Sequence, residues 1–142
     1  MKSKHFKLYE LFPKELYEYL IDKIPEEVMW RMVNPKLIVT LDKLKDKFPL
    51  GTITVNNWYW GGNREWSGLR TPASKWYSKT SRHSKFDAVD AVFSDYDVEA
   101  VRQYILNNQD EFEEVGGIEL GVSWLHTDVR NRHNGKIIVF TA

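Results

Sequence analysis

The amino-acid sequence predicts an α+β domain in which N-terminal helices pack on a small, mainly antiparallel sheet. Apolar residues repeat with helical spacing in the first third of the chain, whereas short alternating or apolar runs dominate the later part. Helices followed by a series of short strands favour this class. The 142 residues suit one domain over 1–142, with a helical part over 1–48 and a core over 50–142 that holds the candidate site.

The helices are expected from proline positions and apolar spacing. Pro13 can open a first helix, and Pro25 restarts the chain. The apolar stripe of this helix comprises Leu16, Leu20 and Ile24. Asn34 and Pro35 form a favourable N-cap and first turn for a further helix. Its apolar positions, spaced four, three and four residues apart, are Leu37, Leu41, Leu44 and Phe48.

Short strands are expected from residue 50 onward. Residues 52–56 alternate polar and apolar side chains, as a half-buried strand does, and 88–93 form an apolar run typical of a buried strand. After the glycine pair at 116–117, three more strands are expected over 118–122, 124–129 and 137–141.

Two other segments separate these strands. Asp97 can cap a helix. The core-facing positions of that helix are Val98, Val101 and Ile105. Residues 57–81 form a polar loop rich in glycine and aromatic residues, and a loop of this length in a small domain tends to be functional.

The composition excludes several classes of protein. Basic and acidic residues number 20 each, so a partner bound through its phosphates, such as nucleic acid, is not expected. No apolar run approaches about 18 residues, so no membrane-spanning helix is expected. The first residues lack the apolar stretch of about 7–15 residues that secretory signals carry. Cysteine is absent, so any metal site must use the four histidines together with aspartate or glutamate.

Four residues stand out as candidates for chemistry. Asp90 interrupts the apolar run 88–93, and a buried carboxylate needs a hydrogen bond, an ion pair or a metal. The alternative is a solvent-facing side chain or an ordinary salt bridge. His83 lies seven residues earlier. His126 and Asp128 share one face of an expected strand, which suits either a metal ligand with an acid/base neighbour or a plain surface pair.

Arg70 and a set of tryptophans lie in or beside the long loop. The planar guanidinium of Arg70 could clamp a substrate carboxylate or pair with a local acid. The tryptophans could line a sugar or peptide groove or pack in the core; they are Trp58, Trp60, Trp66 and Trp76.

The order of several short segments along the chain is more informative about family than any single segment. The segments are Ser-Gly-Leu-Arg-Thr-Pro at 67–72, Ser-Arg-His at 81–83, Ala-Val-Asp at 88–90, Gly-Gly-Ile at 116–118 and His-Thr-Asp at 126–128. This ordered set resembles the zinc peptidase family of D-alanyl-D-alanine carboxypeptidases and L-alanyl-D-glutamate endopeptidases, which includes many phage proteins. The resemblance implies the hedgehog/DD-peptidase type of fold.

The resemblance implies a Zn²⁺ ion held by His83, Asp90 and His126, with water in the fourth position. Two imidazoles and one carboxylate leave an open tetrahedral position, as a catalytic zinc requires. Arg70 is then expected to hold the carboxylate of a stem peptide. Ser81 is expected to orient the ligand loop or to touch the substrate.

The sequence departs from the family at two positions. Phe86 stands where the family has a glycine that permits a tight turn. Ser123 stands where many members have the catalytic glutamate, three residues before the last ligand. The candidates for the general base are therefore Asp128, favoured by its place on the same strand face as His126, and Glu119, just after the glycine pair.

The leading hypothesis is a monomeric zinc metallopeptidase that hydrolyses amide bonds in the stem peptides of peptidoglycan, as a carboxypeptidase or an L-Ala-D-Glu endopeptidase. Without a signal peptide, it is expected to be made in a host cytoplasm and to reach the cell wall by phage lysis or as part of a virion. The second hypothesis is a peptidoglycan-binding or virion module that keeps the fold but has lost hydrolysis. The third is an aromatic-rich carbohydrate-binding domain without metal.

Overall fold

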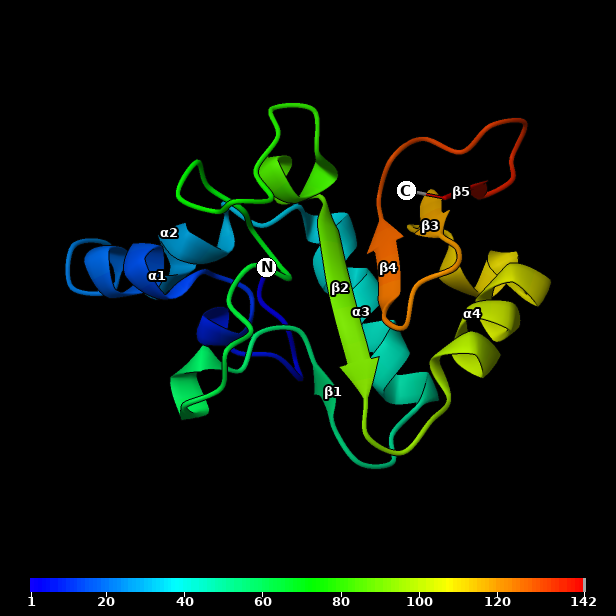
Figure 1. Ribbon diagram of the computed structural model, residues 1–142, viewed down its shortest axis with the longest axis horizontal. Helices are drawn as coiled ribbons and strands as arrows, with labels where there is room; N and C mark the ends of the chain where they lie inside the picture. Colours follow the sequence, from blue (N-terminus) through cyan, green and yellow to red (C-terminus); the bar gives the residue numbers. More distant parts are fainter. Residues whose placement is uncertain (142) are drawn as a thin grey trace.

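The computed structural model describes residues 1–141 and confirms an α+β architecture (Figure 1). Within these residues the helices are α1 (Lys14–Leu20), α2 (Glu26–Trp30), α3 (Pro35–Lys47) and α4 (Val98–Asn107). The strands are β1 (Ile53–Thr54), β2 (Ala88–Phe93), β3 (Gly117–Glu119), β4 (Leu125–Asp128) and β5 (Ile138–Phe140). None of the helices in this part of the chain has the length and apolar character needed to cross a membrane.

The sheet is mixed, with the strand order β1-β2-β4-β3-β5. All neighbouring strands are antiparallel except β3 and β5, which run parallel. The prediction of a mainly antiparallel sheet therefore holds, with one parallel pair at the edge. The long β2 and β4 lie at its centre, and α3 passes behind them in the view of Figure 1.

The helices begin where the sequence predicted. Pro13 and Pro25 take extended backbone angles as the N-caps of α1 and α2. The Asn34 side chain accepts a hydrogen bond from the Lys36 backbone nitrogen at 3.0 Å, which satisfies one free donor in the first turn of α3. Phe48 lies just past the end of α3 as its C-cap, and its ring still packs in the core.

The core joins the buried face of α3 to one face of the sheet. Val89 and Ala91 of β2 belong to this apolar cluster together with Leu41 of α3 and Leu125 of β4. Because side chains alternate along a strand, Asp90 points to the opposite face of the sheet. The segment that β2 needs for packing therefore also presents a carboxylate away from the core.

The strand ends differ from the predicted ones. The first strand covers two residues rather than 52–56, and β3 ends at Glu119 rather than at residue 122. Gly121 has a φ of 77°, a left-handed conformation that a strand does not accommodate, so the chain turns there before β4 begins. The long loop 57–81 contains only one short 3₁₀ helix, Trp58–Trp60.

Candidate metal centre

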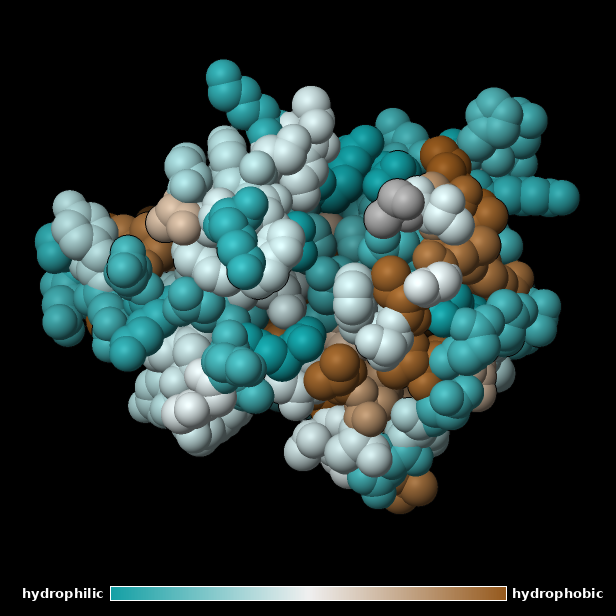
Figure 2. All heavy atoms as spheres, viewed as in Figure 1, coloured by the Kyte–Doolittle hydropathy of each residue, from teal (hydrophilic) through white to brown (hydrophobic). Residues whose placement is uncertain are grey.

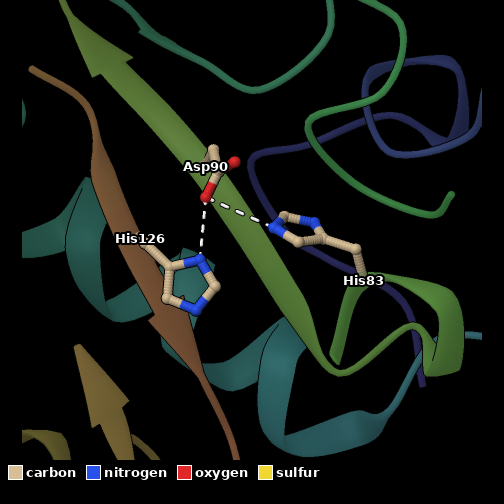
Figure 3. A group of neighbouring side chains, drawn as sticks. All are labelled: His83, Asp90 and His126. Atoms are coloured by element: carbon tan, nitrogen blue, oxygen red, sulfur yellow. Dashed lines mark hydrogen bonds and ion pairs between the residues drawn. The ribbon is translucent and has the colours of Figure 1, made fainter. Parts of the chain in front are cut away.

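Three buried side chains converge from two strands and one turn (Figure 3). The Asp90 Oδ1 atom lies 2.9 Å from His126 Nδ1 and 3.3 Å from His83 Nε2. Each of the three residues offers one donor atom, and these atoms all lie within 4.8 Å of one another. The His83–Asp90–His126 cluster that the sequence suggested is therefore assembled by the fold.

Strand pairing places two of these residues. Asp90 of β2 and His126 of β4 are direct cross-strand partners in the antiparallel register, which brings their Cβ atoms to about 5 Å. His83 comes from the 3₁₀ helix Arg82–Lys85, which leads into β2. The Ser81 hydroxyl caps that helix and accepts a hydrogen bond from the His83 backbone nitrogen at 3.2 Å. Ser81 thus lies where it can orient the ligand loop.

The turn after His83 closes at Phe86. Phe86 has a φ of 59°, a left-handed conformation that glycine adopts more readily than other residues. A non-glycine residue pays about 1–2 kcal/mol for this backbone. Burial of the ring opposes that cost, since Phe86 packs edge-on against Phe12 with ring centroids 5.1 Å apart.

The donor set fits a zinc ion. Neighbouring ligand atoms of a tetrahedral zinc site lie about 3.3 Å apart, since zinc bonds to nitrogen and oxygen measure about 2.0–2.2 Å. The separations of 2.9 and 3.3 Å around Asp90 Oδ1 are close to that value. The other nitrogen of each imidazole is occupied by an acceptor: His83 Nδ1 lies 2.9 Å from the Gly68 carbonyl oxygen, and His126 Nε2 lies 2.9 Å from Asp128 Oδ2. These contacts place a hydrogen on each outer nitrogen, so the inner nitrogens are the ones that can bind a metal.

Charges are tightly coupled around His126. Burial alone would lower the pKa of this imidazole, but hydrogen bonds and charge from Asp128 and Asp90 outweigh it and raise the pKa to about 9. Burial alone would raise the pKa of Asp90, and the hydrogen bonds from His126 and His83 hold it well below the usual range. Without metal, a proton on His126 therefore neutralises part of the negative charge at the centre.

An open cavity of about 750 Å³ lies over these residues. Figure 2 shows hydrophilic side chains gathered in the depression at the middle of this face. The cavity wall carries four arginines and three tryptophans, which are Arg64, Arg70, Arg82, Arg130, Trp66, Trp76 and Trp124. Two tryptophans of the predicted set, Trp66 and Trp76, thus line the cavity, whereas the exposed Trp60 does not belong to its wall.

Arg70 lies at the edge of the cluster. Its Nη2 atom donates to Asp90 Oδ2 at 3.2 Å, and its Nε atom donates to the Trp66 carbonyl at 2.8 Å. Arg70 therefore supports the Asp90 carboxylate as well as lining the cavity. Arg64 was missed at the sequence level. It donates to the Asp90 carbonyl oxygen at 3.1 Å, and nothing in its polar loop distinguished it.

The two candidate bases occupy different surroundings. The Asp128 side chain is fully buried and lies against the outer edge of the His126 ring, so the expected proximity to His126 is present. Glu119, at the end of β3, is partly exposed and lines the cavity, and among the described residues the cavity wall does not include Asp128. Ser123 is exposed. Access from the cavity therefore distinguishes Glu119 from Asp128.

No family model, curated protein or solved structure matches this chain.

Proposed function

We propose that this protein is a zinc-dependent metallopeptidase that hydrolyses amide bonds in the stem peptides of peptidoglycan. The observation that carries the proposal is the convergence of two imidazoles and one carboxylate at the floor of an open cavity. Three protein ligands leave a coordination position for water or substrate, which separates a catalytic zinc site from a structural one. The order of the sequence segments supports the peptidoglycan substrate, with phage lysis or a virion as the setting.

The ligand atoms in this proposal are His83 Nε2, Asp90 Oδ1 and His126 Nδ1. A bound zinc ion supplies an acidified water and polarises the scissile carbonyl. The protein's own part is to hold these atoms at fixed separations. Gly68, Arg70 and Asp128 do this by hydrogen bonds to the ligand side chains.

Glu119 is the better placed of the two proton carriers. A general base must reach the attacking water from the substrate side, and Glu119 lines the cavity. Its carboxylate would accept the water's proton and donate it to the leaving amine. Asp128 is less suited, because hydrogen bonds from His126 and Arg130 outweigh its burial and lower its pKa to about 2. A carboxylate with so low a pKa is a weak proton acceptor.

The cavity wall favours an anionic substrate. Arg64, Arg70 and Arg130 are engaged with carboxylate or carbonyl oxygens. No side-chain hydrogen bond or ion pair within residues 1–141 engages Arg82, which also lines the cavity and precedes the ligand His83. A free guanidinium beside the metal centre suits the carboxylates of a stem peptide.

A second candidate function is peptide binding without hydrolysis. Ser123, in place of the family's catalytic glutamate, is the observation that favours it. In that case the chain would bind zinc and stem peptides but release no product.

Incubation of the zinc-loaded protein with defined muropeptides, followed by mass spectrometry of the products, tests the proposal. We expect cleavage of one type of amide bond, loss of cleavage with a chelator, and recovery when zinc is restored. The His83→Ala variant should be inactive, whereas His133→Ala, which removes an exposed histidine in a turn, should remain active. Cleavage that survives both chelation and His83→Ala would refute the zinc mechanism, and zinc binding without any cleavage would favour the binding module.

A further inference from the structure

An ion pair between the fully buried Asp128 and the partly exposed Arg130 lies at the outer edge of the His126 ring. Arg130 donates two hydrogen bonds to the Asp128 carboxylate, from Nε to Oδ1 at 2.7 Å and from Nη2 to Oδ2 at 2.6 Å. The Arg130 backbone nitrogen adds a third contact to Oδ1 at 3.3 Å. Asp128 Oδ2 also contacts His126 Nε2 at 2.9 Å. The carboxylate is therefore fixed from one side and holds the imidazole on the other.

The glycine pair before β3 makes room for this ion pair. A Cβ atom on Gly117 would lie 2.4 Å from Asp128 Oδ1 and 2.6 Å from Arg130 Nε. A Cβ atom on Gly116 would lie 1.6 Å from the Arg130 carbonyl oxygen. Neither glycine has a positive φ, so space rather than backbone conformation excludes a side chain at both positions.

Phe140 of β5 completes the support. The Arg130 guanidinium lies over its ring at 4.6 Å, and the His126 ring packs edge-on against it with centroids 5.5 Å apart. The Phe140 ring thus contacts both Arg130 and His126, the two residues that Asp128 links by hydrogen bonds. The parallel pairing of β5 with β3 brings Phe140 opposite Glu119 and so to this side of the sheet.

We propose that Asp128 and Arg130 form a positioning pair that fixes the His126 ring and directs its Nδ1 atom to the metal. This inference rests on the proposed function and assigns Asp128 a role other than the general base. A carboxylate can only accept from an imidazole N–H, so Asp128 keeps a hydrogen on Nε2 and leaves Nδ1 as the nitrogen that binds the metal once its own proton has left. Arg130 holds that carboxylate in one orientation, since its two donors match the two carboxylate oxygens.

The affinity for zinc tests the proposal without reference to peptide hydrolysis. Loss of a side chain that supports a metal-bound histidine typically weakens binding by about 10–100-fold. We expect Arg130→Met to weaken zinc binding by this factor, as measured by competition with a chromophoric chelator. Arg130→Lys keeps the charge but not the paired donors, so it should fall between Arg130→Met and the wild type. Arg31→Met, which removes an exposed arginine at the end of α2, should bind zinc as the wild type does.

The ring form of His126 gives a readout that a purely structural role would not change. ¹⁵N NMR of the zinc-loaded wild type should show the hydrogen on Nε2, and Asp128→Ala should weaken zinc binding and broaden or shift this signal while the other histidines keep theirs. Circular dichroism of the metal-free variants identifies any that fail to fold. If Arg130→Met or Asp128→Ala does not fold, the zinc affinity of Arg130→Lys tests the proposal instead.

Three outcomes separate the two proposals. Folded Arg130→Met and Asp128→Ala variants with unchanged zinc affinity would overturn the positioning pair and leave the peptidase proposal standing. Weakened zinc binding in these variants, with no muropeptide cleaved by the wild type, would support the pair and refute the peptidase. A wild-type chain that binds no zinc would overturn both.

Discussion

Zinc binding to this protein should displace a proton from His126, and the affinity should therefore depend on pH. The two carboxylates that flank His126 raise its pKa to about 9 in the metal-free protein. At pH 7, which lies below this pKa, most molecules are then expected to carry the proton. Zinc requires the neutral imidazole, so each ion that binds at pH 7 should release about one proton from this ring.

The expected magnitude follows from the same value. Zinc affinity should rise about tenfold per pH unit between pH 7 and pH 8.5 and level off as the pH passes through the pKa of His126. Isothermal titration calorimetry at pH 7, in buffers with different ionisation enthalpies, counts the protons released. Chelator competition at several pH values gives the slope.

Asp128→Asn provides the control for this measurement. The substitution removes one of the two negative charges that raise the His126 pKa, so fewer protons should be released at pH 7 and the slope should flatten. A zinc affinity that is constant between pH 7 and pH 8.5, with no buffer-dependent heat, would refute the reasoning.

Four further substitutions, at three positions, have distinct expected results. Glu119→Gln should lower kcat for muropeptide hydrolysis by about 10²–10⁴-fold, the usual contribution of a general base, while zinc affinity stays unchanged; equal activity would exclude Glu119 as the base. Phe86→Ala should destabilise the fold by about 3–5 kcal/mol through lost burial, and Phe86→Gly should cost roughly 1–2 kcal/mol less, because glycine relieves the left-handed backbone at φ 59°. Urea denaturation checks that order, and the reverse order would contradict the strained turn. Arg82→Met should raise KM for peptides with free carboxylates more than it lowers kcat, as measured by steady-state kinetics. Amidated peptides serve as controls, and an unchanged KM for the peptides with free carboxylates would contradict this role.

The sequence predicts those parts of the fold that depend on local chemistry. Pro13, Pro25 and Asn34 fix the starts of helices because their conformational preferences are local. The apolar run 88–93, which coincides with β2, is predictable for the same reason, since a buried strand requires a run of mostly apolar residues. The ends of β1 and β3 are harder to predict from the sequence, because they depend on where a partner strand stops and where Gly121 turns the chain.

The identity of the candidate ligands could be predicted from the sequence, but their arrangement in space became known only from the fold. The carboxylate inside an apolar run marked Asp90, and the resemblance of the ordered segments to zinc peptidases implied the set His83, Asp90 and His126. The cross-strand pairing of Asp90 with His126 is a long-range property that spacing alone does not specify. The same holds for the Gly68 carbonyl, whose contact with His83 leaves no signal in the residue type.

The general base illustrates a different limit. Neighbouring positions on one strand face favoured Asp128 at the sequence level, and the two side chains do touch. However, proximity to His126 does not tell whether a side chain lies on the cavity side of that ring or on the opposite side. That difference emerges only when Arg130 and Gly117 close around Asp128 and leave Glu119 at the cavity.

X-ray absorption spectroscopy of the protein loaded with one equivalent of zinc tests the central claim most directly. We predict a four-coordinate site with two imidazole nitrogens and oxygen ligands at about 2.0–2.2 Å, and the loss of one imidazole contribution in His83→Ala. A zinc ion without imidazole ligands, or no retained zinc at all, would contradict the assignment of His83, Asp90 and His126 as a metal centre.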